Sequence, residues 1–164
     1  MNIIDIIILV CCIPALFHGF SKGFVSQAIS LVALVLGVWM SFKFSAPLGE
    51  WLKSFADLPG TILHIIAFAL ILIMVMLVLK LVGMALEKVI KVAMLGWLNK
   101  LLGVVFALLK AILIIGLVII MFDAVYSLIP FVSSDTLSES VLYQPIKDIA
   151  NTVFPFLKGL IFNK

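Results

Sequence analysis

Four long runs of apolar residues, separated by shorter polar segments, dominate the pattern of this chain. A helix needs about 20 apolar residues to cross a hydrocarbon core of about 30 Å, so the pattern predicts four transmembrane spans. They cover residues 3–17, 24–42, 62–79 and 101–122. The first span is the shortest. It contains Asp5, and we expect Pro14 to kink it.

The polar segments predict short helices that lie on the membrane surface. Between residues 47 and 59, apolar residues recur on one helical face and include Trp51, a residue type that is common at the interface. A second amphipathic pattern covers residues 86–97. A third covers the tail from residue 143 to 162, where Pro155 interrupts it.

Composition places the chain in a membrane. Hydrophobic residues make up 65% of the 164 residues, charged residues 12%, and the mean hydropathy is +1.38. A soluble domain of this size could not bury so much apolar surface. We therefore predict an all-α integral membrane protein, with a four-span domain at residues 1–125 and a polar loop and amphipathic tail at residues 126–164. The net charge is +3, and the sequence has no dense basic stripe of the kind that nucleic-acid binding requires.

Lysine placement indicates the orientation, because acidic residues contribute little to the positive-inside rule. Lys22 and the lysines of residues 80–100 fall on one side of the predicted membrane, and the remaining lysines fall on the other. The short loops next to span ends weigh most. They favour an orientation with both chain termini outside the cytoplasm.

Two similar motifs of small residues lie 88 residues apart. Ala15-x3-Gly19-x2-Lys22-Gly23 is matched by Gly103-x3-Ala107-x2-Lys110-Ala111. Residues four apart share a helical face, and small side chains there let another backbone approach closely. The recurrence suggests a parallel repeat of two helix pairs, the first two spans against the last two. The residues predicted to serve helix packing are Gly19, Gly23, Gly103, Ala107 and Ala111.

Lysines within or beside the spans are the main candidates for a polar site. Lys110 lies nine residues, or about 13 Å, into the last span. A lysine at the centre of a span costs about 2.5–3.5 kcal/mol on insertion scales. It either extends its ammonium to the interface or has a paired or water-exposed role, and the same two alternatives hold for Lys22. We predict that both lie near one membrane face, where they bind anionic headgroups or line a polar entrance. The candidate polar, lipid-binding or pathway residues are Asp5, Lys22, Gln27, Asn99, Lys100 and Lys110.

The sequence contains no recognisable catalytic motif. It lacks a nucleophile with a nearby base, a carboxylate pair, a phosphate-binding loop and the spacing of a metal site. Cys11 and Cys12 are adjacent in an apolar run and are poorly placed to bridge each other. The lone His64 suggests no mechanism. We therefore expect no enzymatic activity, no cofactor and no bound metal.

Two blocks of the chain resemble the colicin V production protein (CvpA) family. The first is Asp5 followed by "FSKGFVSQAISL", which is similar to the family's Asp…Arg-Gly-Phe-x-x-x-Ala pattern. The second is "LNKLLGVVFALLKAILI", similar to Asp-Arg-x-x-Gly-x-x-x-Gly-x-x-[Arg/Lys]-Gly, and "SESVLYQP" extends the match toward the C-terminus. This chain has lysine at Lys22 and Lys100 and asparagine at Asn99 where the pattern has arginine and aspartate. A bidentate arginine–carboxylate pair therefore cannot form here.

The resemblance implies a bacterial inner-membrane protein associated with colicin V production or export, a toxin biosynthetic process, and with envelope maintenance. The expected partners are the lipid bilayer with its anionic headgroups, a second copy of the chain, or the export machinery. The polar candidates leave open an alternative, a small channel or transporter. It would have to be an oligomer, because four short spans can hardly enclose a pathway alone.

Overall fold

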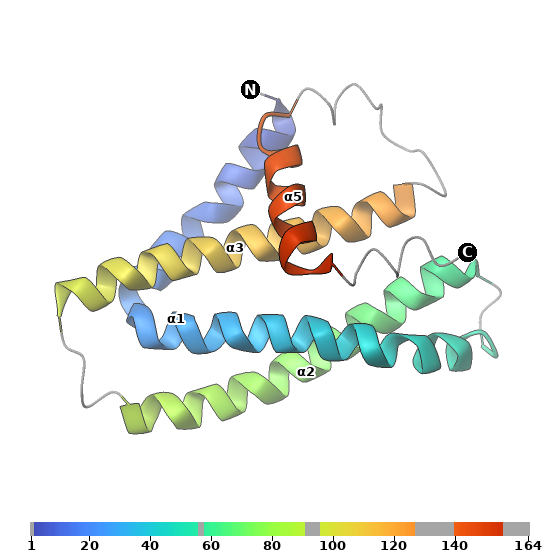
Figure 1. Ribbon diagram of the computed structural model, residues 1–164, viewed down its shortest axis with the longest axis horizontal. Helices are drawn as coiled ribbons and strands as arrows, with labels where there is room; N and C mark the ends of the chain where they lie inside the picture. The colour runs from blue at the N-terminus through green and yellow to red at the C-terminus, as the bar shows by residue number, and fades with distance from the viewer. Residues whose placement is uncertain (1, 56–57, 91–95, 127–139, 156–164) are drawn as a thin grey trace.

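The protein is helical throughout the residues that its computed structural model describes, which are 2–55, 58–90, 96–126 and 140–155. These residues form α1 (Ile3–Leu52), α2 (Gly60–Ile90), α3 (Trp97–Tyr126) and α5 (Tyr143–Val153), as Figure 1 shows. Long apolar segments adopt this structure because a helix satisfies its own backbone hydrogen bonds where water is absent. The predicted all-α class is therefore confirmed for the described residues.

Helix α1 changes direction at Gly23. Its φ of 75° and ψ of 177° fall in a region that essentially only glycine occupies, and no other residue of α1 leaves the helical range. Residues 3–22, here called the first segment, and residues 24–52, the second segment, diverge from this point in Figure 1. Gly23, and not Pro14, is thus the point where the helix breaks.

Three helices, and not the predicted four, are long and apolar enough to cross a membrane. They are Ile3–Leu52, Gly60–Ala85 and Trp97–Tyr126. The difference arises because the first two predicted spans belong to one element, α1, in which a break at a single glycine replaces the expected loop. The sequence pattern detects the polar residues around Lys22 but not the helical dihedrals on either side of Gly23.

Two of the predicted surface helices belong to longer helices. Residues 47–52 are the C-terminal end of α1, which continues through Pro47. Residues 86–90 are the end of α2, and Trp97 begins α3. Residues 91–95 lie outside the described part of the chain. The apolar periodicity at the end of a long helix is the same as that of a separate short helix, so the sequence pattern could not distinguish them.

The second segment of α1 lies between α2 and α3. It runs antiparallel to α2, since Gly49 lies against His64 and Gly37 lies against Met76. It runs parallel to α3, where the rings of Phe24 and Phe106 contact edge to face with centroids 4.8 Å apart. One core cluster joins α1, α2, α3 and the end of α5, and its buried members are Leu34, Val38, Phe68, Leu113, Leu117, Ile120, Ala150 and Phe154.

The first segment of α1 runs antiparallel to α3. Near the N-terminus Ile8 shares a second cluster with Ile119, and at the other end of the segment Gly19 meets Gly103. Both ends of α1 therefore lie on the side of the molecule opposite Gly23, and the two segments form a V around α3 (Figure 1).

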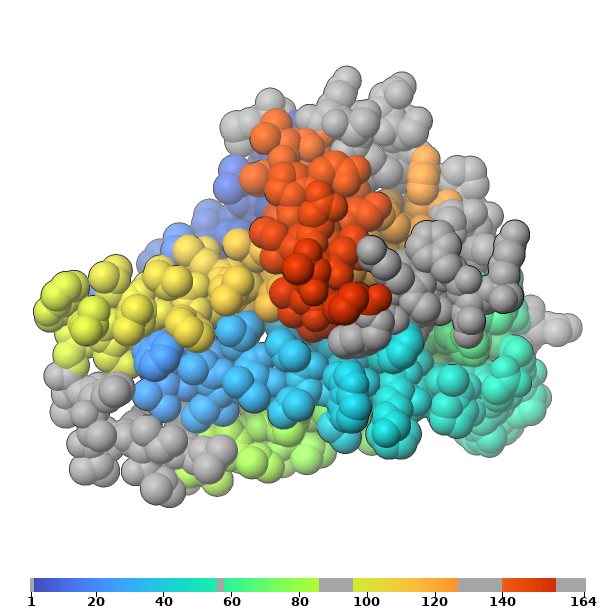
Figure 2. Space-filling model, viewed as in Figure 1, coloured from blue at the N-terminus to red at the C-terminus, as the bar shows by residue number. Residues whose placement is uncertain are grey.

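Helix α5 crosses the face of α3 and has an amphipathic pattern, as the tail was predicted to have. Its apolar face does not lie free on a surface: Tyr143, Ile146 and Ala150 are buried, and Ala150 packs on Gly116 of α3. Figure 2 shows α5 as a ridge across α3. Residues 156–162 of the predicted tail helix lie outside the described residues.

Candidate functional site

The two small-residue motifs contact each other directly. A Cβ atom on Gly19 would lie 2.6 Å from the carbonyl oxygen of Gly103, and one on Gly103 would lie 2.5 Å from that of Gly19. The Ala107 side chain, 1% exposed, covers the same crossing. The α1 and α3 backbones therefore touch, and only glycine permits this separation.

This contact differs from the predicted parallel repeat of helix pairs. Residues 15–23 end the first segment of α1, whereas residues 103–111 lie in the N-terminal half of α3. The motifs thus do not occupy equivalent places in two similar halves. They are alike because both sides of one close crossing need small residues.

Asn99 caps the helix that restarts after Gly23. The backbone N–H of Phe24 donates to Asn99 Oδ1 at 2.9 Å. In an ordinary N-cap the side chain comes from the residue at the helix start. Here glycine occupies that place, and α3 supplies the side chain. A Cβ on Gly23 would lie 2.5 Å from Asn99 Nδ2, so the same glycine also makes room for its cap.

Lys110 and Gln27 form a polar contact within the apolar helices. Lys110 Nζ donates to Gln27 Oε1 at 2.6 Å, and Gln27 Nε2 donates to the carbonyl oxygen of His18 at 3.4 Å. Gln27 is 1% exposed and Lys110 is half-buried. Gln27 therefore joins the two segments of α1 to the middle of α3.

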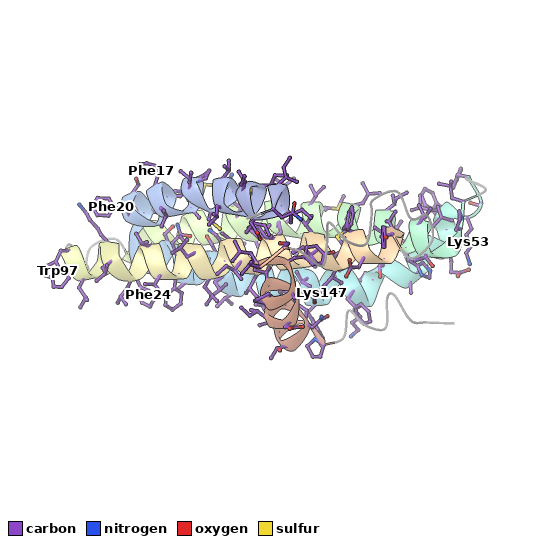
Figure 3. All side chains as sticks on the ribbon, turned by 90° about the horizontal axis from the view of Figure 1, so that it is seen from above. Phe17, Phe20, Phe24, Lys53, Trp97 and Lys147 are labelled. Carbon is purple, nitrogen blue, oxygen red and sulfur yellow. The ribbon has the colours of Figure 1, made fainter. Side chains whose placement is uncertain are left out.

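Lys22 and Lys100 lie at the apex of the V, where α1 breaks at Gly23. Both side chains are exposed, and Lys100 Nζ lies 5.1 Å from the centroid of the Phe20 ring, a cation–π contact. Figure 3 shows Phe17, Phe20 and Trp97 at this end, with Lys53 at the opposite end of the molecule. Of the predicted lysines, only Lys110 points into the helix packing.

Ala111, the last of the predicted packing residues, borders an apolar groove. The groove lies between the first segment of α1 and α3, has a volume of about 510 Å³, and is lined mainly by isoleucines together with Cys11, Ala111, Phe122 and Tyr143. Unlike Gly19 and Gly103, Ala111 is half-buried.

Asp5 joins the beginning of the chain to α5. It is 1% exposed, and its carboxylate accepts hydrogen bonds from Ser140 Oγ at 2.6 Å and from the backbone N–H groups of Leu142 at 3.0 Å and Val141 at 3.4 Å. It also accepts from the N–H of Asn2 at 3.0 Å, which completes a capping box at the start of α1. A buried carboxylate is stable only with such donors.

A second carboxylate, Asp123, holds the next turn of α5. The Tyr143 hydroxyl donates to Asp123 Oδ1, and Lys147 forms an ion pair with Asp123 Oδ2. Burial, together with the neighbouring carboxylate, raises the pKa of the Tyr143 phenol above its usual range. The sequence identified Asp5 as a candidate but neither its partner Ser140 nor the role of Asp123.

The described residues contain no group of three or more His, Cys, Asp or Glu side chains that could hold a metal ion. The predicted absence of metal, cofactor and catalysis remains a prediction.

These observations define the class of protein: an all-helical, multi-pass membrane protein in which α3 is held against both segments of a broken α1. The chain belongs to the colicin V production protein family, whose family model matches residues 4–151. The match includes both small-residue motifs and most of α5, and it confirms the resemblance predicted from the sequence. No curated protein and no solved structure matches the chain significantly.

Proposed function

We propose that this protein serves colicin V production or export and envelope maintenance as a non-enzymatic protein of the bacterial inner membrane. The observation that carries the proposal is the family match over residues 4–151. The hydrogen bonds of these polar groups support a non-catalytic role, because they hold the helices together: Asn99 caps a helix and Asp5 anchors α5. Export machinery is the expected protein partner.

A secretion assay tests this role. A strain that produces colicin V and lacks its own copy of the gene is complemented with this chain, and extracellular toxin is measured together with sensitivity to envelope stress. We expect complementation to restore both. A strain that exports toxin normally without any copy of the gene contradicts the proposal.

The distribution of charge supports a placement in the membrane. From Lys100 to Asp123, α3 extends over 23 residues, or about 35 Å, which is close to the hydrocarbon thickness of about 30 Å. We propose that the Gly23 end, with exposed Lys22 and Lys100, faces the cytoplasm and that the N-terminus faces outward. Reporter fusions at Lys164 and Lys91 test this orientation. A cytoplasmic signal at Lys164 and an external one at Lys91 overturn it.

The exposed residues of α5 support a position at the outer interface. One exposed flank carries Gln144 and Asp148, and the other carries Ile149 and Val153, which are 41% and 36% exposed. A helix at the interface meets water on one flank and acyl chains on the other. This placement extends the predicted interfacial tail: the third flank of α5 packs on α3.

The contact between Lys110 and Gln27 favours a second candidate function, a small oligomeric channel or transporter. Polar groups among apolar membrane helices commonly belong to transport pathways. We expect Lys110→Met to cause little or no loss of stability, because the lost hydrogen bond, about 1–3 kcal/mol, is offset by removal of an insertion cost of about 2.5–3.5 kcal/mol. Ion flux in reconstituted vesicles should then fall strongly while thermal unfolding changes little. A protein whose detergent-corrected mass is that of a monomer argues against this function.

A further inference from the structure

The segments that cross at Gly23 differ in charge from the parts of the molecule around Lys53 and Lys147. The segments that meet at the Gly23 end, residues 16–24 and 96–104, contain the exposed Lys22 and Lys100 and no acidic residue. Elsewhere both signs occur together, with Lys53 beside Glu50 at 2.9 Å and Lys147 beside Asp123. Lys53 and Lys147 are thus paired with carboxylates, whereas Lys22 and Lys100 belong to segments that contain none.

Exposed aromatic side chains lie at the same end of the molecule as these two lysines. Phe17, Phe20 and Trp97 are 72%, 57% and 76% exposed, and Figure 3 shows them together at the Gly23 end. An exposed tryptophan such as Trp97 is typical of the boundary between hydrocarbon and headgroups. Lys100, held over the ring of Phe20, has its ammonium at the same level. The lysines are therefore placed where lipid phosphates lie.

We propose that the Gly23 end is a binding surface for anionic phospholipid headgroups, with Lys22 and Lys100 as the charged contacts and Phe17, Phe20 and Trp97 beside the upper acyl chains. Lys110 does not belong to this surface, since its ammonium contacts Gln27 in the helix packing. Anionic headgroups complement the two lysines, whereas zwitterionic headgroups carry no net charge to attract them. The proposal is independent of any role in toxin export.

The native tryptophans allow a direct test with a built-in control. Trp97 marks the Gly23 end and Trp51 marks the opposite end, and both are exposed. Two variants are made, each with one of these as the single tryptophan: Trp39→Phe with Trp51→Phe, and Trp39→Phe with Trp97→Phe. Each is placed in vesicles of phosphatidylcholine with a minor fraction of phosphatidylglycerol. Fluorescence quenching is compared when bromine is carried by one lipid or by the other.

We expect brominated phosphatidylglycerol to quench Trp97 more than random mixing allows, and to quench Trp51 only as random mixing predicts. Each lysine near an anionic surface contributes attraction that corresponds to about a fivefold enrichment. Lys22→Ala with Lys100→Ala should therefore abolish the preference at Trp97, whereas the matched pair Lys43→Ala with Lys53→Ala should leave it unchanged. High salt should reduce the preference in the protein with its native lysines, because the Debye length falls to about 3 Å at 1 M.

Equal quenching of Trp97 and Trp51 overturns the proposal. So does a preference at Trp97 that persists after both lysines are replaced, since the lysines then do not attract the lipid. If the lysine variant does not fold, the salt dependence of the protein with its native lysines still tests the proposal. A preference at Trp97 that does not fall at high salt is not due to charge attraction and overturns it.

Discussion

The two ends of α3 are held to the rest of the molecule by opposite means. At the Gly103 end, contact with α1 depends on the absence of side chains and on two amides: Asn99 caps α1, and Gln27 accepts from Lys110. At the Asp123 end, two carboxylates, Asp5 and Asp123, hold α5 through hydrogen bonds and an ion pair. The two ends differ because one joins two apolar helices, whereas the other joins α5, which carries polar residues.

Two apolar helices in lipid gain little from hydrophobic burial, because the acyl chains around them are equally apolar. Their association depends on close packing, which the glycines at the α1–α3 crossing allow. Helix α5 carries polar residues and needs hydrogen-bond partners to fix its position. Packing by shape at one end and anchoring by charge at the other should therefore respond differently to mutation.

The largest effect is expected at the backbone contact. Gly103→Ala places a Cβ 2.5 Å from the Gly19 carbonyl and 2.6 Å from the backbone carbon of Gly23, neither of which can move alone. We expect a loss of about 3 kcal/mol, the upper part of the range for overpacking. Thermal unfolding in detergent measures it. Gly37→Ala is the control, since its nearest neighbour is the flexible Met76 side chain, with Sδ 3.1 Å away. Equal losses in both variants would show that the backbone contact is not special.

The anchor of α5 should give the next largest effect. Asp5→Ala removes the acceptor for Ser140, Val141 and Leu142, and we expect a loss of about 2 kcal/mol together with faster proteolysis within residues 140–155. Asp5→Asn retains one carbonyl oxygen and should lose less. Because Asp5 also belongs to the capping box of α1, a double-mutant cycle with Ser140→Ala isolates the α5 contact. A coupling energy near zero contradicts the anchoring role.

The cap supplied by Asn99 should have a smaller effect. Asn99→Leu removes the acceptor for the Phe24 N–H and should cost about 1 kcal/mol, the usual value of an N-cap. Asn99→Asp should lose less stability than Asn99→Leu, because a carboxylate also accepts this bond and its charge is favourable at a helix N-terminus. Chemical unfolding of the two variants in detergent measures the difference. If aspartate destabilises as much as leucine does, Asn99 does not act as a cap.

The smallest effect concerns pH and Tyr143. Below about pH 10 the phenol is protonated in both the folded and the unfolded chain, so it adds no pH dependence. Above that pH the unfolded chain loses the proton, while burial and Asp123 raise the pKa of the folded phenol. The unfolded state then binds fewer protons, and stability falls as pH rises. The decline in unfolding temperature above pH 10 should be shallower in Tyr143→Phe, and identical slopes would contradict the assignment.

Much of the packing could be predicted from the sequence, because four-residue spacing of small side chains identifies a close crossing from one helix alone. This spacing led to Gly19, Gly103 and Ala107. The partners of Asn99 and Asp5 could not be predicted, because they lie 75 and 135 residues away and no local pattern records them. The periodicity of α5 predicted its apolar face but not what that face covers, since a membrane surface and α3 suit it equally.

The hydrogen bonds of Asp5 have a consequence for how the chain is made. Ser140 leaves the ribosome 135 residues after Asp5, which at about 5–20 residues per second is about 7–27 s later. For most of that interval the first segment of α1 also lacks α3, its neighbour at Gly19 and Ile8. In the newly made chain, the N-terminal segment therefore depends on the insertion machinery and on lipid until α5, the last described helix, is complete. Loss of residues 140–155 would leave it without its anchor from the start.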